Sequence, residues 1–394
     1  MRTKTIQDLV HLDGRRVLVR VDFNVPLRDG QVADDHRVRA AVPTLISLLS
    51  RGARVLCASH LGRPGGTEVP ALSLSPVADV LSSHLKRRVT FISPCVGPRA
   101  ESRAAALPAG EVALLENVRF EPGETENDGV LAARLAALAD AYVNDAFGTA
   151  HRAHASTEGV ARLVRPAVAG ALMEREVRCL TRVLEPDHRP YVAVLGGAKI
   201  AGKIDLIEHL IPRVDHLLIG GAMAYTFLVA RGVPVGRSLV DRARVRLAGQ
   251  LLTRAEEEGV RIDLPVDHVT RSSLTAGSCG ITSGAEIAPD ELGGDIGPRT
   301  VERFAGILSG AGTILWNGPL GAFEHEGFES GTRAVAEAIR SGPGYSVVGG
   351  GDSAAALRHL GVEEGFDHIS TGGGASLAFL SGQTLPGLAA LEQV

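Results

Sequence analysis

The most distinctive chemistry lies in residues 345–357, where a short apolar run is followed by three glycines and an alanine-rich segment. This order predicts a buried strand, a tight loop and a helix. The glycines would let the backbone approach a ligand, and free N–H groups at a helix start suit a phosphate. Asp352 and Ser353 lie at that start, and Asp352 would repel a bare phosphate unless Mg²⁺ lay between them. The stretch predicts either a site for a Mg²⁺-bound phosphate or a plain turn capped by Asp352.

Two lysines form a second candidate site for phosphate chemistry. Lysine and arginine together number 41, yet only four of these residues are lysines. Lys199 and Lys203 lie four residues apart and directly follow the Gly196-Gly197 pair. An ammonium is a compact charge on a flexible stem, which arginine does not supply. The pair predicts cations that neutralise a phosphoryl group, and chance placement is the alternative.

In the first half of the chain, charged and polar residues follow predicted strands. Strands are expected at residues 16–21, 53–58, 112–115 and 141–143, with helices between them, so the sheet should be parallel. Ligands bind beyond the carboxyl ends of the strands of such sheets. The residues found there are Asp22, Asn24, His60, Arg63, Arg119 and Arg152, with Arg37 at a helix start. If the arginines converge at this edge, their guanidinium groups predict a site for a phosphate or a carboxylate. The alternative is that they are separate surface residues, which are common in a chain so rich in arginine.

The second half repeats the alternation of strands and helices. Strands are expected at residues 191–195, 217–219, 261–264, 313–316 and 345–348, and most of them end in glycine loops. A long connecting helix is expected at residues 167–184, before Pro186 and Pro190 mark a domain boundary. Residues 270–288 are polar and are expected to be loop-rich. None of the glycine loops has the spacing of a dinucleotide-binding fingerprint or a Walker A loop.

Composition limits the classes of protein that remain. The chain has 394 residues, which suggests two or three domains, and a net charge of −4, which argues against nucleic-acid binding. No apolar run approaches the length of a membrane span. The four cysteines, Cys57, Cys95, Cys179 and Cys279, have neither the spacing of a disulfide framework nor that of a zinc site. We therefore expect the protein to reside in the reducing cytoplasm. We expect a monomer that binds small molecules, with no nucleic acid and no membrane as partner.

Several segments together resemble the signature sequences of the phosphoglycerate kinase family, in that family's order. They are residues 20–26, 59–64, 116–120, 195–199, 316–319, 349–353 and 370–376. The resemblance implies an α/β fold of two similar-sized three-layer domains with parallel sheets, joined by a long helix and a hinge. It places the phosphoglycerate-binding domain at residues 1–166, the connecting helix at 167–186 and the nucleotide-binding domain at 187–378. A tail at 379–394 is expected to return to the N-terminal domain.

The resemblance also implies the reaction, which is reversible phosphoryl transfer from 1,3-bisphosphoglycerate to MgADP, giving 3-phosphoglycerate and MgATP. The positions that match the phosphoglycerate site are Asp22, Phe23, Asn24, Arg37, His60, Leu61, Gly62, Arg63, Arg119 and Arg152. Those that match the site for ATP or ADP are Lys203, Gly293, Asn317, Glu324, Gly350, Gly351, Asp352 and Ser353. Asp352 matches the Mg²⁺ ligand, and Arg37, Lys199 and Lys203 match the groups around the transferring phosphoryl.

The residue chemistry agrees with this reaction. The carboxylate that accepts the phosphoryl group is ionised at neutral pH, so no general base is needed. Alignment, cations and exclusion of water are needed instead. Because the cations are divided between the two halves of the chain, we expect the domains to close on both ligands.

Two positions depart from the family pattern. Gly294 stands where the family usually has a leucine that helps to sandwich the adenine, which predicts a weaker preference for adenine. Ala378 stands where the family usually has an acidic residue.

The sequence disfavours three other functions. A non-catalytic binding relative is disfavoured because Arg37, Lys203 and Asp352 are all present. An oxidoreductase that uses a dinucleotide is disfavoured by the absent fingerprint. A nucleic-acid-binding protein is disfavoured by the net charge.

Overall fold

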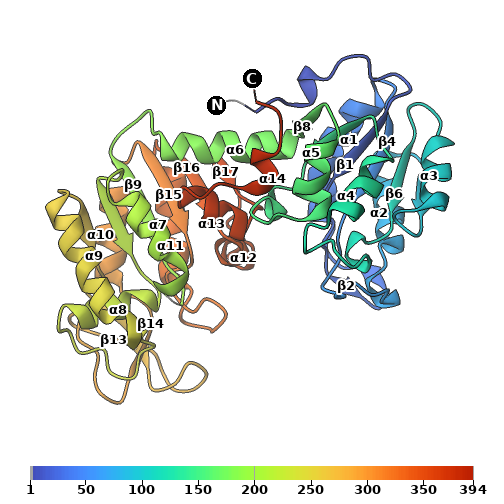
Figure 1. Ribbon diagram of the computed structural model, residues 1–394. Coiled ribbons are helices and arrows are strands. Elements are labelled where there is room, and N and C mark those ends of the chain that lie inside the picture. The colour runs from blue at the N-terminus through green and yellow to red at the C-terminus, as the bar shows by residue number, and fades with distance from the viewer. Residues whose placement is uncertain (1–2, 199, 394) are drawn as a thin grey trace. The chain divides into compact units, whose positions relative to one another are not determined.

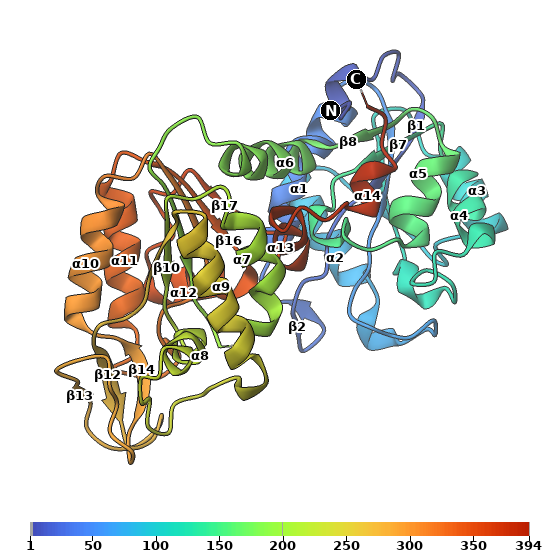
Figure 2. The ribbon, with the colours of Figure 1, turned by 60° about the vertical axis from the view of Figure 1, so that its left-hand side comes forward.

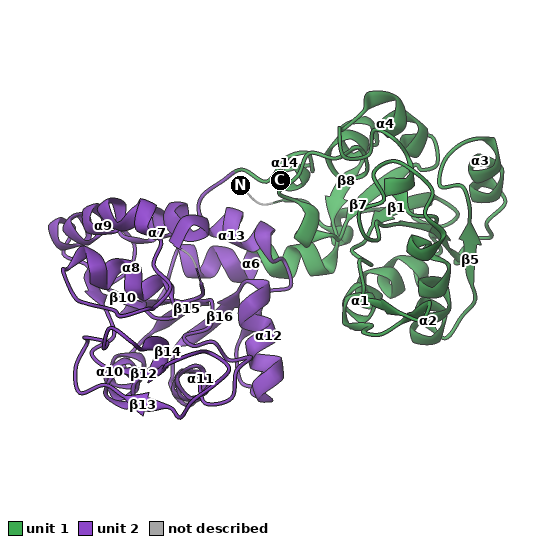
Figure 3. Cartoon of the chain, turned by 90° about the horizontal axis from the view of Figure 1, so that it is seen from below, with its two compact units in different colours: residues 1–177, 384–394 green, residues 178–383 purple. Residues whose placement is uncertain are grey.

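The protein consists of two compact units (Figure 3). The computed structural model describes residues 3–198 and 200–393. Unit 1 is formed by residues 1–177 and 384–394, and unit 2 by residues 178–383. The boundary at residue 178 falls inside the helix α6 (Ala171–Leu184).

Unit 1 is built on a six-stranded parallel sheet (Figure 1). Its strands are β1 (Arg16–Arg20), β4 (Arg54–Ala58), β5 (Val89–Ile92), β6 (Val112–Leu115), β7 (Ala141–Asn144) and β8 (Ala167–Ala169). Their order in the sheet is β5-β6-β4-β1-β7-β8. A short hairpin, β2 (Leu27–Arg28) and β3 (Gln31–Val32), follows β1. The strands that precede the predicted phosphoglycerate residues are therefore the four central ones, β6, β4, β1 and β7.

Helices cover the sheet of unit 1 and bury both of its faces. They are α1 (His36–Leu49), α2 (Ser75–Leu85), α3 (Pro98–Ala105), α4 (Gly129–Ala136), α5 (Val160–Leu163) and, near the C-terminus, α14 (Pro386–Ala389). Val17 and Val19 of β1 pack in one core with residues of α1 and α2, which lie on that face (Figure 2). Leu18 points to the other face and is also fully buried. Burial on both sides explains why these strands are continuous apolar runs without alternation.

The expected helix at residues 167–184 is wrong at its first turn. Residues Ala167–Ala169 form the strand β8, which pairs in parallel with β7, and α6 begins only at Ala171. Asp145 decides the break, because its Oδ1 accepts hydrogen bonds from the N–H groups of Leu172 (2.9 Å) and Met173 (3.2 Å). These bonds satisfy donors that a helix start leaves free. A side chain at Gly170 would overlap the Asp145 carboxylate, so only glycine fits the turn.

Unit 2 is built on a second six-stranded parallel sheet. Its strands are β9 (Tyr191–Leu195), β10 (His216–Ile219), β11 (Arg261–Asp263), β15 (Thr313–Asn317), β16 (Tyr345–Gly349) and β17 (His368–Ile369). Their order is β11-β10-β9-β15-β16-β17, so β9, β15 and β16 are neighbours at the centre. The lysine segment and the glycine loops that follow these three strands therefore share one edge of the sheet.

The helices of unit 2 complete its core. They are α7 (Ile204–Leu210), α8 (Met223–Ala230), α9 (Val245–Glu257), α10 (Pro298–Leu308), α11 (Ser330–Ser341), α12 (Gly351–Leu360) and α13 (Gly374–Leu380). Phe304 of α10 and Val335 of α11 pack with Trp316 and Ile314 of the central strand β15. Among the described residues, none of the helices combines the length and the apolar character that crossing a membrane would require.

Residues 270–288 lie mostly in loops, as predicted, but the stretch also contributes to a small sheet. A three-stranded antiparallel sheet is formed by β12 (His268–Arg271), β13 (Gly280–Ile281) and β14 (Leu292–Ile296). Polar side chains bond the strand β12 to residues next to the other two strands. Thr270 donates to a carboxylate oxygen of Glu291 at 2.8 Å, and the hydroxyl of Thr282 accepts from the N–H of His268 at 2.9 Å. Polar groups paired in this way can form part of a sheet, which polarity alone does not predict.

Candidate active site

The carboxyl edge of the sheet in unit 1 gathers the first set of predicted residues. Arg20, the last residue of β1, is in register with Ala58 of β4 and with Asn144 of β7. The loops that leave these strands therefore start side by side. They bring Asp22 and His60, which were expected at this edge, to within 4.0 Å of each other.

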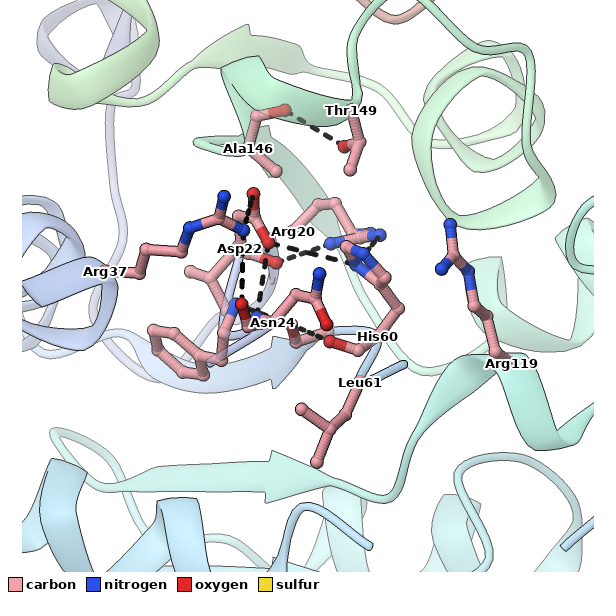
Figure 4. A network of polar contacts seen from close by, with 12 residues as sticks. Arg20, Asp22, Asn24, Arg37, His60, Leu61, Arg119, Ala146 and Thr149 are labelled. Atoms are coloured by element: carbon pink, nitrogen blue, oxygen red, sulfur yellow. Dashed lines mark hydrogen bonds and ion pairs between the residues drawn. The ribbon is translucent and has the colours of Figure 1, made fainter. Parts of the chain in front are cut away.

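Asp22, Asn24 and Arg37 form one hydrogen-bonded group at this edge (Figure 4). Arg37 reaches from the first turn of α1 and donates from Nη1 to Asp22 Oδ2 at 3.0 Å and to the carbonyl oxygen of Asn24 at 3.2 Å. Asn24 Oδ1 accepts from the N–H of Gly62 at 2.9 Å, which ties the first loop to the second. The group holds the Arg37 guanidinium, a predicted catalytic cation, in a fixed place on unit 1.

Arg20 is a central residue of the site that the sequence reasoning missed. Its side chain is fully buried and donates to Ser156 Oγ at 2.8 Å and to the backbone carbonyl of Val21, and it lies 3.2 Å from His60 Nδ1. Ser156 in turn donates from its hydroxyl (2.6 Å) and its N–H (2.9 Å) to the buried carboxylate of Glu124. The signal in the sequence was a charged residue closing an otherwise apolar strand. A buried charge needs such partners.

Three of the predicted arginines surround one cavity. The cavity has a volume of about 570 Å³, and Arg63, Arg119, Arg152 and His154 contribute to its lining. Burial, together with the charges of neighbouring arginines, lowers the pKa of Arg119 to about 10. Crowded cations of this kind are stabilised by an anion placed among them. The cavity is therefore suited to a phosphate group.

Two histidines beside the arginines are neutral at physiological pH. Burial, aided by the charges of Arg20, Arg119 and Arg37, holds the pKa of His60 well below its usual value. Burial and the same kind of neighbours lower the pKa of His154 to about 4. A neutral imidazole can both donate and accept a hydrogen bond. These side chains can therefore bind oxygen atoms of a ligand without adding to the repulsion among the arginines.

Phe23 and Leu61 were expected at the phosphoglycerate site, but their side chains belong to the hydrophobic core. The Phe23 N–H donates to Ser59 Oγ at 2.8 Å. The N–H and the carbonyl of Leu61 are both bonded to the amide group of Asn117, at 3.2 and 2.7 Å. The two residues thus fix the loops that carry Asp22 and Gly62.

The carboxyl edge of the sheet in unit 2 gathers the second set of residues. The ammonium of Lys203 donates to the carbonyl oxygen of Asn317 at 2.8 Å and to its side-chain Oδ1. Burial lowers the pKa of Lys203 to about 8, although the nearby carboxylate of Asp352 raises it. The structure therefore places Lys203 against the end of β15. The other predicted lysine, Lys199, lies outside the described residues.

The loop between β16 and α12 has the form expected of a phosphate-binding loop. Gly350 has a φ of 89°, a conformation that favours glycine, and no side chain caps the helix that follows it. Ser353 accepts from the N–H of Gly318 at 2.6 Å and donates to the carbonyl of Gly349 at 2.7 Å, so it joins the ends of two adjacent strands. Asp352 lies exposed in the first turn of α12.

A larger cavity, of about 780 Å³, lies within unit 2. Gly293, Glu324 and Asp352 were expected at the nucleotide site and contribute to its lining. Side chains that were not expected also contribute, namely Arg237, Leu239, Leu274 and Phe323. These residues could not be predicted because they come from segments far apart in the chain. The combination of apolar walls, a carboxylate for hydroxyl groups and a phosphate loop suits a nucleotide.

Gly294 has no room for the leucine that the family usually has there. A Cβ at Gly294 would overlap the ring of Phe328, whose side chain is fully buried. Gly293 is equally confined, because a Cβ there would overlap the hydroxyl of Tyr225. In this chain the Phe328 ring occupies the space of the missing side chain, so the change at Gly294 is accommodated by packing and leaves no empty cavity.

Replacing Gly294 with leucine is therefore expected to destabilise unit 2 by about 1–3 kcal/mol through overpacking. The double variant Gly294→Leu/Phe328→Ala should be destabilised by less than the sum of the losses in the two single variants, because the two side chains compete for one space. Urea unfolding of the full chain measures both. Gly306→Leu is the control, since nothing lies within 4 Å of a Cβ at Gly306. A Gly294→Leu variant as stable as this control would contradict the overlap.

Comparisons with known proteins show the family of the chain. The family model described as phosphoglycerate kinase matches residues 6–383. A phosphoglycerate kinase of Thermomicrobium roseum is 52% identical over 391 residues and covers 99% of both chains. One of Thermus thermophilus is 54% identical, with 98% of this chain and all of the relative covered. The solved phosphoglycerate kinase of Coxiella burnetii has a TM-score of 0.92 at 41% identity and covers 98% of both chains. The chain belongs to the phosphoglycerate kinase family.

Proposed function

We propose that, in the reaction of this family, each of the two units binds one of the two substrates. The chain is a phosphotransferase that moves a phosphoryl group reversibly from 1,3-bisphosphoglycerate to ADP, giving 3-phosphoglycerate and ATP. Unit 1 binds the phosphoglycerate at Arg63, Arg119, Arg152 and His60. Unit 2 binds the nucleotide along the edge formed by β9, β15 and β16. The observation that carries this proposal is the cavity in unit 1 that three arginines line, because guanidinium groups match phosphate oxygens.

The mechanism needs charged groups in fixed positions, and it needs no general base to remove a proton from the attacking group. The carboxylate of 3-phosphoglycerate is ionised at neutral pH and attacks the γ-phosphorus of ATP directly in the reverse direction. Arg37, held by Asp22, and Lys203, held by Asn317, approach the phosphoryl oxygens as the charge develops. Lys199, four residues before Lys203 in the sequence, is proposed to assist. Fixed cations of this kind lower the barrier because they need no reorganisation during the reaction.

Asp352 is the residue that would hold Mg²⁺ with the nucleotide. In the described part of the chain, no three His, Cys, Asp or Glu side chains are grouped closely enough to hold a metal ion. A single exposed carboxylate beside an uncapped helix start fits Mg²⁺, which commonly takes one or two carboxylates together with phosphate oxygens. The ion would offset the negative charge of the phosphates, while the N–H groups of α12 bind their oxygens.

The two units are proposed to close when both ligands are bound. The reacting atoms must come within roughly 3–3.5 Å, and each ligand is proposed to bind mainly one unit. One ligand alone should therefore change the equilibrium little, whereas both together favour the closed state by contacts made only there. Small-angle scattering should show a smaller radius of gyration in the ternary complex than in the apo or singly liganded protein. An unchanged radius in an active preparation would refute closure.

If each unit binds one substrate, a variant in either unit should change KM for the substrate of that unit and leave KM for the other substrate unchanged. Arg63→Ala should raise KM for 3-phosphoglycerate about tenfold or more and leave KM for ATP within twofold, because a hydrogen bond to a charged group is worth about 1.5–3 kcal/mol. Asp352→Ala should raise KM for MgATP and leave that for 3-phosphoglycerate. Steady-state assays in which each substrate is varied measure the split. A variant that raises both constants equally would count against separate half-sites.

We also propose that the enzyme acts as a monomer in the cytoplasm and has no nucleic-acid partner. Cys57, Cys95, Cys179 and Cys279 are free thiols, as a reducing compartment would keep them. The net charge of −4 disfavours nucleic acid. Sedimentation of the active protein should give a mass near 41.2 kDa, and a stable dimer would contradict the proposal.

A further inference from the structure

The side chain of Asn117 joins two loops at the carboxyl edge of the sheet in unit 1. Asn117 lies two residues after β6 and is fully buried. Its Oδ1 accepts hydrogen bonds from the N–H groups of Leu61 at 3.2 Å and of Arg119 at 3.0 Å. Its Nδ2 donates to the carbonyl oxygens of Leu61 at 2.7 Å and of Leu72 at 2.9 Å. The oxygen and both N–H groups of the amide are therefore bonded to the backbone.

These bonds close the base of a long segment between β4 and α2. The segment consists of residues 61–72, and Asn117 is bonded to its first residue, Leu61, and to its last, Leu72. Between these ends the segment carries Arg63, which lines the cavity of unit 1. One buried side chain therefore fixes both ends of the segment that carries this arginine.

Glu116 holds the backbone next to this junction. Its Oε1 accepts from the N–H groups of Asn117 at 2.8 Å and of Leu74 at 3.0 Å. Its Oε2 accepts from the hydroxyl of Ser73 at 2.8 Å. The backbone of Asn117 is therefore tied to the residues that follow the segment, which leaves the amide little freedom to move.

Arg119, a second arginine of the cavity, is bonded to the same segment. Its Nη1 donates to the carbonyl oxygen of Gly62 at 2.6 Å, and its own carbonyl oxygen accepts from the N–H of Gly66 at 3.2 Å. Leu61 and Arg119 follow β4 and β6, which are paired neighbours in the sheet (Figure 4). Asn117 thus connects two arginines of the cavity, Arg63 through the base of its segment and Arg119 through its N–H group.

We propose that Asn117 is a positioning residue of the phosphoglycerate site, which holds Arg63 and Arg119 at the separation that one bound phosphoglycerate requires. The proposal rests on unit 1 being the phosphoglycerate-binding unit. Because the side chain of Asn117 is fully buried, it acts through the two arginines and does not touch the ligand. Arginines that are already in place lose less freedom when the ligand binds, so the bound state is favoured.

The first test measures KM for each substrate in Asn117→Ser. Serine is too short to reach all four partners of the amide, so the arginines should lose their fixed separation. KM for 3-phosphoglycerate should rise about tenfold, as on loss of a hydrogen bond to a charged group. KM for MgATP and kcat should stay within about twofold, because uniform binding of one substrate is lost. Asn117→Asp, which keeps the size of the side chain but lacks both N–H donors, should show the same split.

The matched control is Leu81→Ala, since Leu81 of α2 is fully buried in the core of the same unit and far from any hydrogen bond of the amide. It should lower the urea concentration at which the chain unfolds, because it leaves a cavity in the core, and should leave both KM values unchanged. Circular dichroism checks that each variant is folded. If Leu81→Ala raised KM for 3-phosphoglycerate as much as Asn117→Ser, loss of stability alone would explain the effect and the proposal would fall.

A second test asks whether Asn117 acts through Arg63. Arg63→Ala should raise KM for 3-phosphoglycerate about tenfold in the parent but only about threefold or less in Asn117→Ser, because a displaced guanidinium has less binding to lose. Equal effects in the two backgrounds, or KM within twofold of the parent in a folded Asn117→Ser, would overturn the proposal. Arg63→Ala without any effect in the parent would instead refute the proposed phosphoglycerate site, and the role of Asn117 with it.

Discussion

Replacing Lys203 with alanine is expected to lower kcat by about 10²–10³ while the protein stays folded. The ammonium of Lys203 is fixed by two hydrogen bonds to Asn317 at the end of β15. A fixed cation near the transferring group stabilises the transition state more than the bound substrate. The loss of one comparable donor costs about 2.7–4 kcal/mol. Steady-state turnover with saturating substrates measures the effect, and circular dichroism checks the fold.

The pH dependence gives Lys203 a second, independent signature. Because burial lowers its pKa to about 8, the ammonium loses its proton as the pH rises through that value. The kcat/KM for the nucleotide should therefore fall above pH 8, since this ratio reports groups of the free enzyme. Lys203→Arg keeps its charge at every pH tested and should lose this decline. Lys86→Ala, at an exposed lysine of unit 1, is the control. A Lys203→Ala variant within a few-fold of the parent would exclude the catalytic role.

Replacing Arg20 with methionine is expected to destabilise unit 1 by on the order of 3–5 kcal/mol. That is the usual cost of removing one member of a buried charged group. Arg20 is fully buried and connects through Ser156 to the carboxylate of Glu124. Burial raises the pKa of Glu124, and the charge of Arg20 opposes this rise. Without Arg20, Glu124 would lose the charge that compensates it.

Thermal and urea unfolding of the full chain measure this loss. Arg63→Met is the matched control, because Arg63 is an exposed arginine at the same edge and its removal should hardly change stability. The double variant Arg20→Met/Glu124→Gln should be more stable than the two single costs would predict, since it leaves no buried charge unpaired. If Arg20→Met unfolded at the urea concentration of the parent, the buried network would not support unit 1.

The sequence predicted the edges of the two sheets well because apolar runs and the polar residues after them are local signals. Asp22 and His60 follow β1 and β4 as expected, and these strands are neighbours. Gly350 and Asp352 likewise lie at the start of a helix that follows a strand. In a parallel sheet the carboxyl ends of neighbouring strands lie at one edge, so residues that follow different strands come together there.

The parts that could not be predicted depend on contacts between distant segments. The strand β8 exists because it pairs with β7, and α6 starts at Ala171 because a carboxylate 26 residues earlier accepts its N–H groups. The lack of a side chain at Gly294 is visible in the sequence, but the Phe328 ring that fills the space is not. The apolar walls of the larger cavity, such as Leu274, come from loops without a sequence pattern of their own.

The most direct test of the account follows both substrates at once. Phosphorus NMR of 1,3-bisphosphoglycerate and MgADP, with the purified chain present, should show the acyl phosphate disappearing as the γ-phosphate of ATP appears in equal amount. Omitting ADP should stop the enzyme-dependent loss of acyl phosphate, because ADP, and not water, accepts the phosphoryl group. Lys203→Ala should slow both signals together. Acyl phosphate consumed without ATP, or no consumption by a folded parent, would contradict phosphoryl transfer between the two half-sites.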